Sequence, residues 1–177
     1  MTHGRFYDDF ELGAVYQHWP GKTVTEYDHH LFCLLTMVRH PIHMDHRFAE
    51  TATEHGRPLV ISSYVFSLLL GLSEPDIAGA ALAHRGFGEI RHEAPLFHGD
   101  TLYAESKILA KEKPSDKPGR GTVEVETRGV NQHGTEILTF TRRLEVPLGH
   151  HPLTQPGSHE AWPFTGETAR RLATRDT

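Results

Sequence analysis

The spacing of apolar residues is helical in the first half of the chain. Between residues 26 and 38 apolar side chains recur every three or four positions, which predicts a helix with one buried face. These positions are Tyr27, Leu31, Leu34, Leu35 and Val38. Thr25 and the acidic Asp28 three residues later are typical of a helix N-terminus. Pro41 disfavours helical geometry at His40, so we expect the helix to end near Val38 and an exposed turn to follow.

Two further helices are predicted before residue 73. A short one is expected from Asp45 to about Glu54, because Gly56 and Pro58 follow it. In the next segment, residues 62–72, nearly every residue is apolar and there is almost no polar face. A helix that is apolar all round must be covered on all sides. We therefore expect residues 62–72 to form the central helix of the core.

The period changes to two in the second half of the chain, as expected for strands with one buried face. Alternation runs over residues 102–111, resumes at Val123 after the turn-rich loop 114–121, and continues from Leu138 to Val146. Three consecutive strands of this kind predict an antiparallel meander. A further strand is expected through residues 87–91. An initial extended segment is interrupted at residues 19–21 by Trp-Pro-Gly.

One apolar helix followed by antiparallel strands predicts a sheet wrapped around that helix, because the helix needs cover on nearly every side. This is the hotdog arrangement, an α+β fold. We expect one such domain over residues 1–148, since 177 residues with 37% hydrophobic content suffice for a single core. Residues 149–177 are polar and contain three prolines, which predicts a tail that packs over the surface or over a partner subunit.

Charge and hydropathy argue against several classes of function. The chain has no apolar run of about 18 residues and no apolar N-terminal segment. We therefore expect neither a membrane span nor a secretory signal, and we predict a cytoplasmic protein. A net charge of −5 without a basic block argues against nucleic-acid binding. The single cysteine, Cys33, lies within the first predicted helix and is expected to be a buried, unreactive thiol.

Fifteen histidines raise the question of a metal site. His40, His43 and His46 follow one another at a spacing of three, which on a helix would place them on one face. Pro41 interrupts that helix, however, and neither an HExxH motif nor a pair of cysteines accompanies the run. We therefore expect no metal at these histidines.

Residues 35–45 resemble a catalytic signature. The MaoC-type (R)-specific enoyl-CoA hydratases carry the motif Gly-Asp-x-Asn-Pro-Leu-His, whose Asp and His act in one active site. The Pro-Ile-His of residues 41–43 matches the end of that motif, while Val38 stands at the Asp position and His40 at the Asn position. The resemblance covers residues 5–147. Two more segments are typical of the family: Gly-Arg-Pro-Leu-Val at 56–60 and Pro-Leu-Phe-His-Gly-Asp-Thr-Leu at 95–102.

This resemblance implies reversible hydration or dehydration of an enoyl thioester, without a metal or redox cofactor. His43 is the implied general acid or base, because an imidazole titrates near neutral pH. Backbone N–H groups at Ser62 and Ser63, at the start of the buried helix, are implied to hold the thioester oxygen. Because Val38 is not a carboxylate, the second catalytic group is either absent or supplied from elsewhere.

Two residues near His43 are candidates for the missing group. His40 is placed to orient the substrate or to share proton transfer with His43. Asp45 lies two residues beyond His43. An Asp at that position is also a common helix cap in the family, so a structural role for Asp45 stays open.

The run is most similar to the branch of the family that hydrates branched C5 dicarboxylic acyl-CoA esters, such as mesaconyl-CoA or itaconyl-CoA. The second carboxylate of such a substrate would need a cation in the pocket. The candidate residues are Arg39, Arg57, Arg85 and Arg91.

Two other functions stay open. Loss of the Asp is compatible with an accessory acyl-CoA-binding subunit that pairs with an active partner. Hotdog thioesterases use the same helix start with a carboxylate on or near the helix, but here Glu74 and Asp76 follow only its far end. We expect a homodimer or a higher homo-oligomer, because hotdog sheets commonly pair edge to edge, with the active site at the interface.

Overall fold

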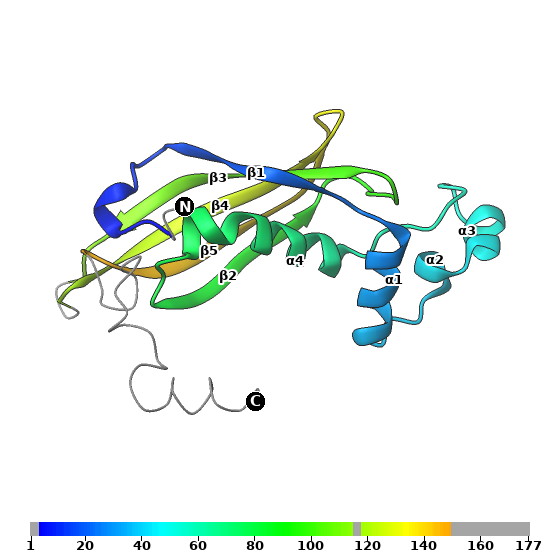
Figure 1. Cartoon of the computed structure of the whole chain (residues 1–177), viewed down its shortest axis with the longest axis horizontal. Coiled ribbons are helices and arrows are strands. Elements are labelled where there is room, and N and C mark those ends of the chain that lie inside the picture. Colours follow the sequence, from blue (N-terminus) through cyan, green and yellow to red (C-terminus); the bar gives the residue numbers. More distant parts are fainter. Residues whose placement is uncertain (1–3, 115–117, 150–177) are drawn as a thin grey trace, which may run out of the picture.

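In a computed structural model, residues 4–114 and 118–149 form a sheet of five antiparallel strands and four helices (Figure 1). The strands are β1 (Val15–Thr23), β2 (Ala83–His92), β3 (Thr101–Glu112), β4 (Arg120–Asn131) and β5 (Glu136–Pro147). Their order across the sheet is β1-β3-β4-β5-β2, so β1 and β2 form the edges. The helices are α1 (Glu26–Leu35), α2 (Pro41–Met44), α3 (His46–Ala52) and α4 (Ser62–Ser73), and short turns η1 (Tyr7–Asp9) and η2 (Glu74–Ala78) precede β1 and follow α4.

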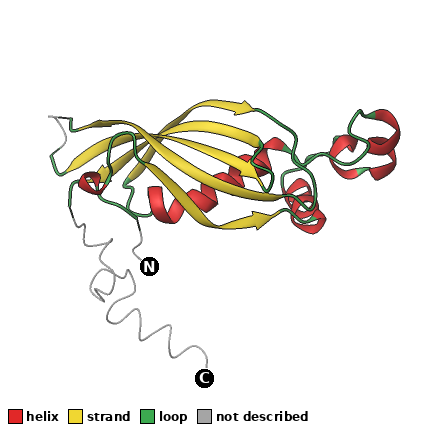
Figure 2. Ribbon diagram, turned by 90° about the horizontal axis from the view of Figure 1, so that it is seen from above, coloured by secondary structure: helices red, strands yellow, loops and turns green. Residues whose placement is uncertain are grey.

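The sheet curls around α4, which lies along one of its faces (Figures 1 and 2). Helix α4 contacts β1, β3 and β4. Helices α1, α2 and α3 lie beyond the end of the sheet, next to the N-terminal end of α4. The hotdog arrangement predicted from the sequence is therefore confirmed. In the described part of the chain, no helix combines the length and the hydropathy that a bilayer span requires. The predicted tail lies almost entirely outside the described residues.

The predicted meander is confirmed as β3, β4 and β5. The alternation in β3 sets its inward side, where Leu102, Ala104 and Ile108 are buried. The strand predicted through residues 87–91 is the centre of β2, which pairs with β5, so that Ile90 lies opposite Phe140. The last strand before the meander thus closes the far edge of the sheet.

The predicted interruption at residues 19–21 does not end the first strand. β1 continues from Val15 to Thr23, and the irregular residues fall inside it. They shift its register against β3 between His18 and Lys22. An edge strand tolerates such an irregularity because only one of its sides carries the ladder of hydrogen bonds.

Two clusters of buried apolar side chains form the core. The larger lies between α4 and the sheet, and burial of each large aliphatic side chain in it is worth about 1.5–3 kcal/mol. The smaller lies near η1 and η2. The larger cluster contains Val24, Val60, Tyr64, Val65, Leu69, Leu96, Leu102, Ala104, Ile137, Leu138 and Phe140, and the smaller contains Tyr7, Phe10, Ile77, Ala78, Ile108, Val123, Val125, Leu144 and Val146.

Helix α4 is the central helix, but the prediction that it is buried all round is wrong. Val65 and Leu69 are buried against the sheet. Ser63, Ser67 and Gly71 follow one another at a spacing of four, and all three are exposed. The hydroxyl of Ser67 donates to the carbonyl of Ser63 at 2.8 Å. A stripe of small residues therefore gives the helix one side that faces solvent in the single chain.

Helix α1 begins as predicted but buries a different face. Thr25 caps it, since its hydroxyl accepts from the Asp28 N–H at 3.1 Å. The prediction of a buried apolar face is wrong, because Leu34 and Leu35 are 66% and 76% exposed. The buried residues are His29 and Cys33 instead. Polar contacts made by His29, described below, decide which side of the helix turns inward.

Several polar side chains occupy inward positions of the sheet, among them His18 and Arg142. His18 of β1 is buried, with Nδ1 2.8 Å from Asp76 Oδ2 and Nε2 2.8 Å from Ser106 Oγ. Arg142 of β5 is 1% exposed, and its Nη2 donates to Ser73 Oγ at 2.8 Å. The described residues provide no acceptor for its Nε and Nη1. Arg142 is therefore a buried charge without a full set of partners in the described chain.

Candidate active site

The segment after α1 contains a single helical turn, α2, where the sequence predicted an exposed turn. Pro41 is its first residue, a position at which the missing N–H has no helical partner to lose. His40 caps this turn, because its Nδ1 accepts from the Ile42 N–H at 3.3 Å. His43 is part of the same turn and reaches the segment that precedes α4.

The hydrogen bond of His43 fixes its tautomer. Nδ1 of His43 lies 2.7 Å from the carbonyl oxygen of Leu59. Because a carbonyl oxygen only accepts, Nδ1 carries the proton and donates it. In the neutral ring Nε2 then has a free lone pair. His43 is half-buried, so this lone pair is held in a defined direction at the edge of the protein.

Two histidines that the sequence analysis did not select extend from His43: His29 lies beside His43, and His98 lies beside His29. The ring centroid of His29 is 6.0 Å from that of His43, and His29 is fully buried. Its Nε2 accepts from the backbone N–H of Ile61 at 3.0 Å. Its Nδ1 must then carry the proton, which it donates to Nε2 of His98 at 2.8 Å. This chain of neutral imidazoles joins α1, the start of α4 and the loop before β3.

Burial keeps both of these histidines neutral. Desolvation first, and then the charge of the neighbouring His98, lower the pKa of His29 to about 4. Desolvation also lowers the pKa of His98. The Cys33 Sγ lies 3.4 Å from Nε2 of His29, and burial raises the pKa of this thiol. The prediction that Cys33 is buried is confirmed, and its lack of reactivity stays a prediction that the raised pKa supports.

The start of α4 directly follows the Ile61 N–H that His29 binds. Ser62 and Ser63 are the first two residues of the helix, and both are exposed. The first N–H groups of a helix have no partner within it, and no described residue accepts from these two. They also carry the positive end of the helix dipole. These groups are thus suited to an oxygen that gains negative charge.

A cavity of about 270 Å³ opens beside this helix start. Leu59 links it to His43, because Leu59 both lines the cavity and holds Nδ1 of His43. A cavity of this size suits a small acyl group better than a whole nucleotide. Glu93 brings a carboxylate to the same lining, which the sequence analysis did not select. The lining residues are Leu59, Val60, Ser62, Val65, His92, Glu93, Ala94, Pro95, Leu96 and Ile137.

The two candidates for the missing carboxylate occupy different places. The ring centroid of His40 is 6.2 Å from that of His43, so these two predicted residues are brought together. Asp45 caps α3, with Oδ1 accepting from the Phe48 N–H at 2.9 Å. This is the structural role that the sequence left open. The catalytic role of Asp45 stays a prediction.

The four candidate arginines fall into two groups. Arg85 forms an ion pair with Glu145, and Arg91 lies 2.6 Å from Glu89. Arg57 is exposed and stacks its guanidinium 3.7 Å from the ring centroid of Phe97. Arg39 is exposed, and no described carboxylate pairs with it. Arg39 and Arg57 are therefore the arginines that keep charge available for a ligand.

The fold and site together define a hotdog domain in which an oriented histidine faces the start of the central helix. The chain belongs to the MaoC like domain family, whose model matches residues 9–131. This confirms the resemblance seen in the sequence.

Known relatives extend this identification. The chain is 35% identical over 143 residues to mesaconyl-CoA hydratase of Cereibacter sphaeroides, covering 81% of this chain and 41% of that protein. It is 33% identical over 144 residues to beta-methylmalyl-CoA dehydratase of Chloroflexus aurantiacus, covering 81% and 40%. The chain spans about two fifths of the length of these curated relatives. Among solved structures, a conserved hypothetical protein of Mycobacterium tuberculosis with a double hotdog fold has a TM-score of 0.70 at 22% identity, over 93% of this chain and 50% of that one.

Proposed function

We propose that this chain is an acyl-CoA hydratase or dehydratase in which His43 moves a proton between water and an enoyl thioester bound at the start of α4. The hydrogen bond from His43 Nδ1 to the carbonyl of Leu59 carries this proposal, because it leaves Nε2 free as a base. The names of the two relatives, a hydratase and a dehydratase, support the reaction class.

The geometry supports the following steps. In hydration, Nε2 of His43 takes a proton from water as the water oxygen bonds to the β-carbon. The electron pair of the double bond moves toward the thioester oxygen, where the N–H groups of Ser62 and Ser63 stabilise the charge. The His43 imidazolium then returns the proton to the α-carbon, and dehydration is the reverse. His40, beside His43, keeps its predicted role of orienting the substrate.

We propose a branched dicarboxylic acyl-CoA as the substrate class. The name mesaconyl-CoA hydratase of the 35% identical relative supports it. Arg39 and Arg57 are the cations available for the second carboxylate. An Arg39→Ala or Arg57→Ala variant should raise KM for dicarboxylic substrates more than for plain acyl chains. Equal effects on the two substrate classes would rule out this use of the arginines.

We propose a homodimer formed through the free edge of β2. Phe87 and Ile90 of this edge strand are 45% and 44% exposed. A second copy would cover them and extend the sheet, with the active sites at the interface. Light scattering should give twice the chain mass of 20.0 kDa. A CoA ester as substrate also favours the cytoplasmic location expected from the sequence.

The first test is turnover of crotonyl-CoA, mesaconyl-CoA and itaconyl-CoA, followed through loss of the enoyl-thioester absorbance. His43→Ala should lower kcat at least about 100-fold, since a general acid or base contributes that much. His133→Ala, in the exposed turn between β4 and β5, is the matched control and should retain full activity.

Two negative outcomes point elsewhere. Binding of all three esters without turnover would favour the accessory acyl-CoA-binding subunit. Release of free CoA would indicate a thioesterase, although Glu74 lies twelve residues beyond Ser62, about 18 Å along α4.

A further inference from the structure

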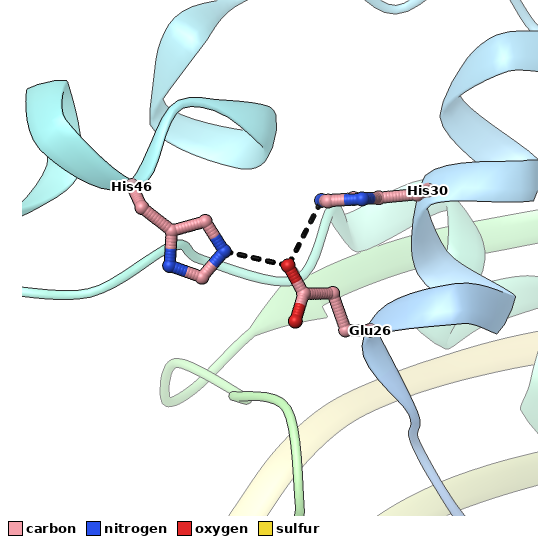
Figure 3. Close-up of side chains that lie close together, drawn as sticks. All are labelled: Glu26, His30 and His46. Atoms are coloured by element: carbon pink, nitrogen blue, oxygen red, sulfur yellow. Dashed lines mark hydrogen bonds and ion pairs between the residues drawn. The ribbon is translucent and has the colours of Figure 1, made fainter.

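Three side chains that the proposed reaction does not use point toward one another (Figure 3). Glu26 and His30 lie one turn apart on α1, and His46 is the first residue of α3. Nε2 of His46 is 2.6 Å from Oε1 of Glu26, and Nε2 of His30 is 3.9 Å from the same oxygen. The three donor atoms all lie within 4.8 Å of one another. We infer that Glu26, His30 and His46 form a binding site for a divalent transition metal of the zinc class.

The donor set selects this class of metal. Two imidazole nitrogens and one carboxylate oxygen suit zinc and its first-row neighbours, whereas magnesium and calcium prefer oxygen ligands throughout. Bonds of about 2.0–2.2 Å to a tetrahedral zinc place the donor atoms about 3.4 Å apart. The observed separations from Glu26 must therefore change by less than about 1 Å. The side chains of Glu26 and His46 are 50% and 60% exposed, so both are free to adjust.

The state of His30 is the second observation. Its Nε2 is buried, and no described residue gives it a hydrogen bond. The 3.9 Å separation from Glu26 Oε1 is too long for one. A buried ring nitrogen that faces a carboxylate across such a gap lacks a partner. A cation between the two atoms would supply that partner and would bind both side chains at once.

This set differs from the histidine run weighed in the sequence. His46 belongs to that run, but its Nε2 turns to Glu26 of α1. His43 turns to Leu59 instead, and His40 caps α2. The sequence spacing of three therefore does not produce the cluster, which depends on the meeting of α1 with the start of α3.

The site would act as a clamp on the segment that carries His43. The ligands stand on both sides of residues 31–45, so a bound metal closes this segment into a loop. Closing a loop removes conformational freedom from its residues. Helices α2 and α3 lie beyond the end of the sheet, on the far side of α1 from it (Figures 1 and 2). The metal would thus stabilise the position of α2.

The test uses the full chain, produced without a histidine tag and stripped with EDTA. Zinc titration by calorimetry should show one tight site per chain, and Co²⁺ should give the visible absorption of a tetrahedral complex. Zinc at 100 times its Kd should raise Tm by about 5 °C or more. Each of two variants at exposed ligands, Glu26→Gln and His46→Ala, should weaken zinc binding at least tenfold. Glu50→Gln and His133→Ala are the matched controls and should bind zinc as the unaltered protein does.

Two results would overturn the inference. One is zinc binding no tighter than about 100 µM, which is typical of scattered surface histidines. The other is unchanged affinity in both ligand variants, which would place the metal elsewhere. Neither measurement involves turnover, so failure of this site and failure of the proposed hydratase activity are separate outcomes.

Discussion

Replacement of the buried Arg142 by methionine should stabilise the protein. Desolvation lowers the pKa of Arg142 from 12.5 to about 10, although the charge of Glu74 acts in the opposite direction. Each unit of pKa corresponds to about 1.4 kcal/mol, so folding destabilises the charged form of Arg142 by about 3 kcal/mol relative to its neutral form. Arg142 is charged at neutral pH, so the folded protein carries this cost. Methionine fills a similar volume without charge.

The substitution also removes one hydrogen bond. Nη2 of Arg142 donates to Ser73 Oγ, and such a bond contributes about 1 kcal/mol. The Ser73 hydroxyl keeps a partner, because it also donates to the Leu69 carbonyl at 2.6 Å. The net gain for Arg142→Met is therefore about 2 kcal/mol. In a chain of this length that corresponds to a rise in Tm of about 4–8 °C.

Thermal and urea unfolding at pH 7.5, followed by circular dichroism, measure this change. Arg143→Met is the matched control, because Arg143 is exposed and its ion pair with Glu124 contributes little. We expect that control to change stability by less than about 0.5 kcal/mol. A loss of more than 1 kcal/mol in Arg142→Met would refute the reasoning, and it would mean that the guanidinium is fully paired in the assembled protein.

Three further predictions concern the core, the pH dependence and the turn after α1. Leu69→Ala should lower the free energy of unfolding by about 3–5 kcal/mol in urea titrations, because Leu69 is fully buried; a loss below 1 kcal/mol would contradict its central place. Burial lowers the pKa of His18, so on acidification the unfolded chain takes up its proton before the folded protein does, and the free energy of unfolding should fall as pH drops below about 6.5. His18→Gln should flatten this dependence of stability on pH, and an unchanged dependence would refute the role of His18. Met37 has a φ of 61° and is 64% exposed, so its backbone is strained while its side chain packs little. Met37→Gly should therefore raise the free energy of unfolding by about 0.5–1 kcal/mol, and Met37→Val should lower it. Calorimetry that gives both variants a change of the same sign would be inconsistent with strain at this residue.

Local pattern predicted the elements of this fold better than their burial. The capping pair Thr25 and Asp28 marked the start of α1, and alternation marked β3 to β5. Which side of α1 turns inward could not be predicted, because a long-range contact decides it. His29 binds Ile61, which is 32 residues away in the chain. A polar residue that makes such a bond overrides the apolar stripe on the opposite side.

In the candidate site, too, some residues could be predicted from local sequence and others depend on tertiary contacts. The family resemblance selected His43, Ser62 and Ser63, and the structure brings His43 to Leu59, close before the start of α4 where the two serines lie. Their catalytic roles stay predictions. His29 has no motif, and His98 lies in the segment 95–102 that was quoted only for the family resemblance. The two histidines meet only because α1 packs against the loop before β3. The use of Asp45 as a cap could be foreseen from its position before α3, whereas the cavity at Glu93 depends on tertiary packing.

Apolar side chains are exposed on two elements, and those of α1 contradict the predicted burial of its apolar face. Leu34 and Leu35 of α1 and Phe87 and Ile90 of β2 are apolar residues with large exposed fractions in one chain. A single soluble domain seldom leaves apolar side chains together on the surface without a function. The homodimer proposed above would cover Phe87 and Ile90 of β2, so the exposure of these two side chains is consistent with that proposal.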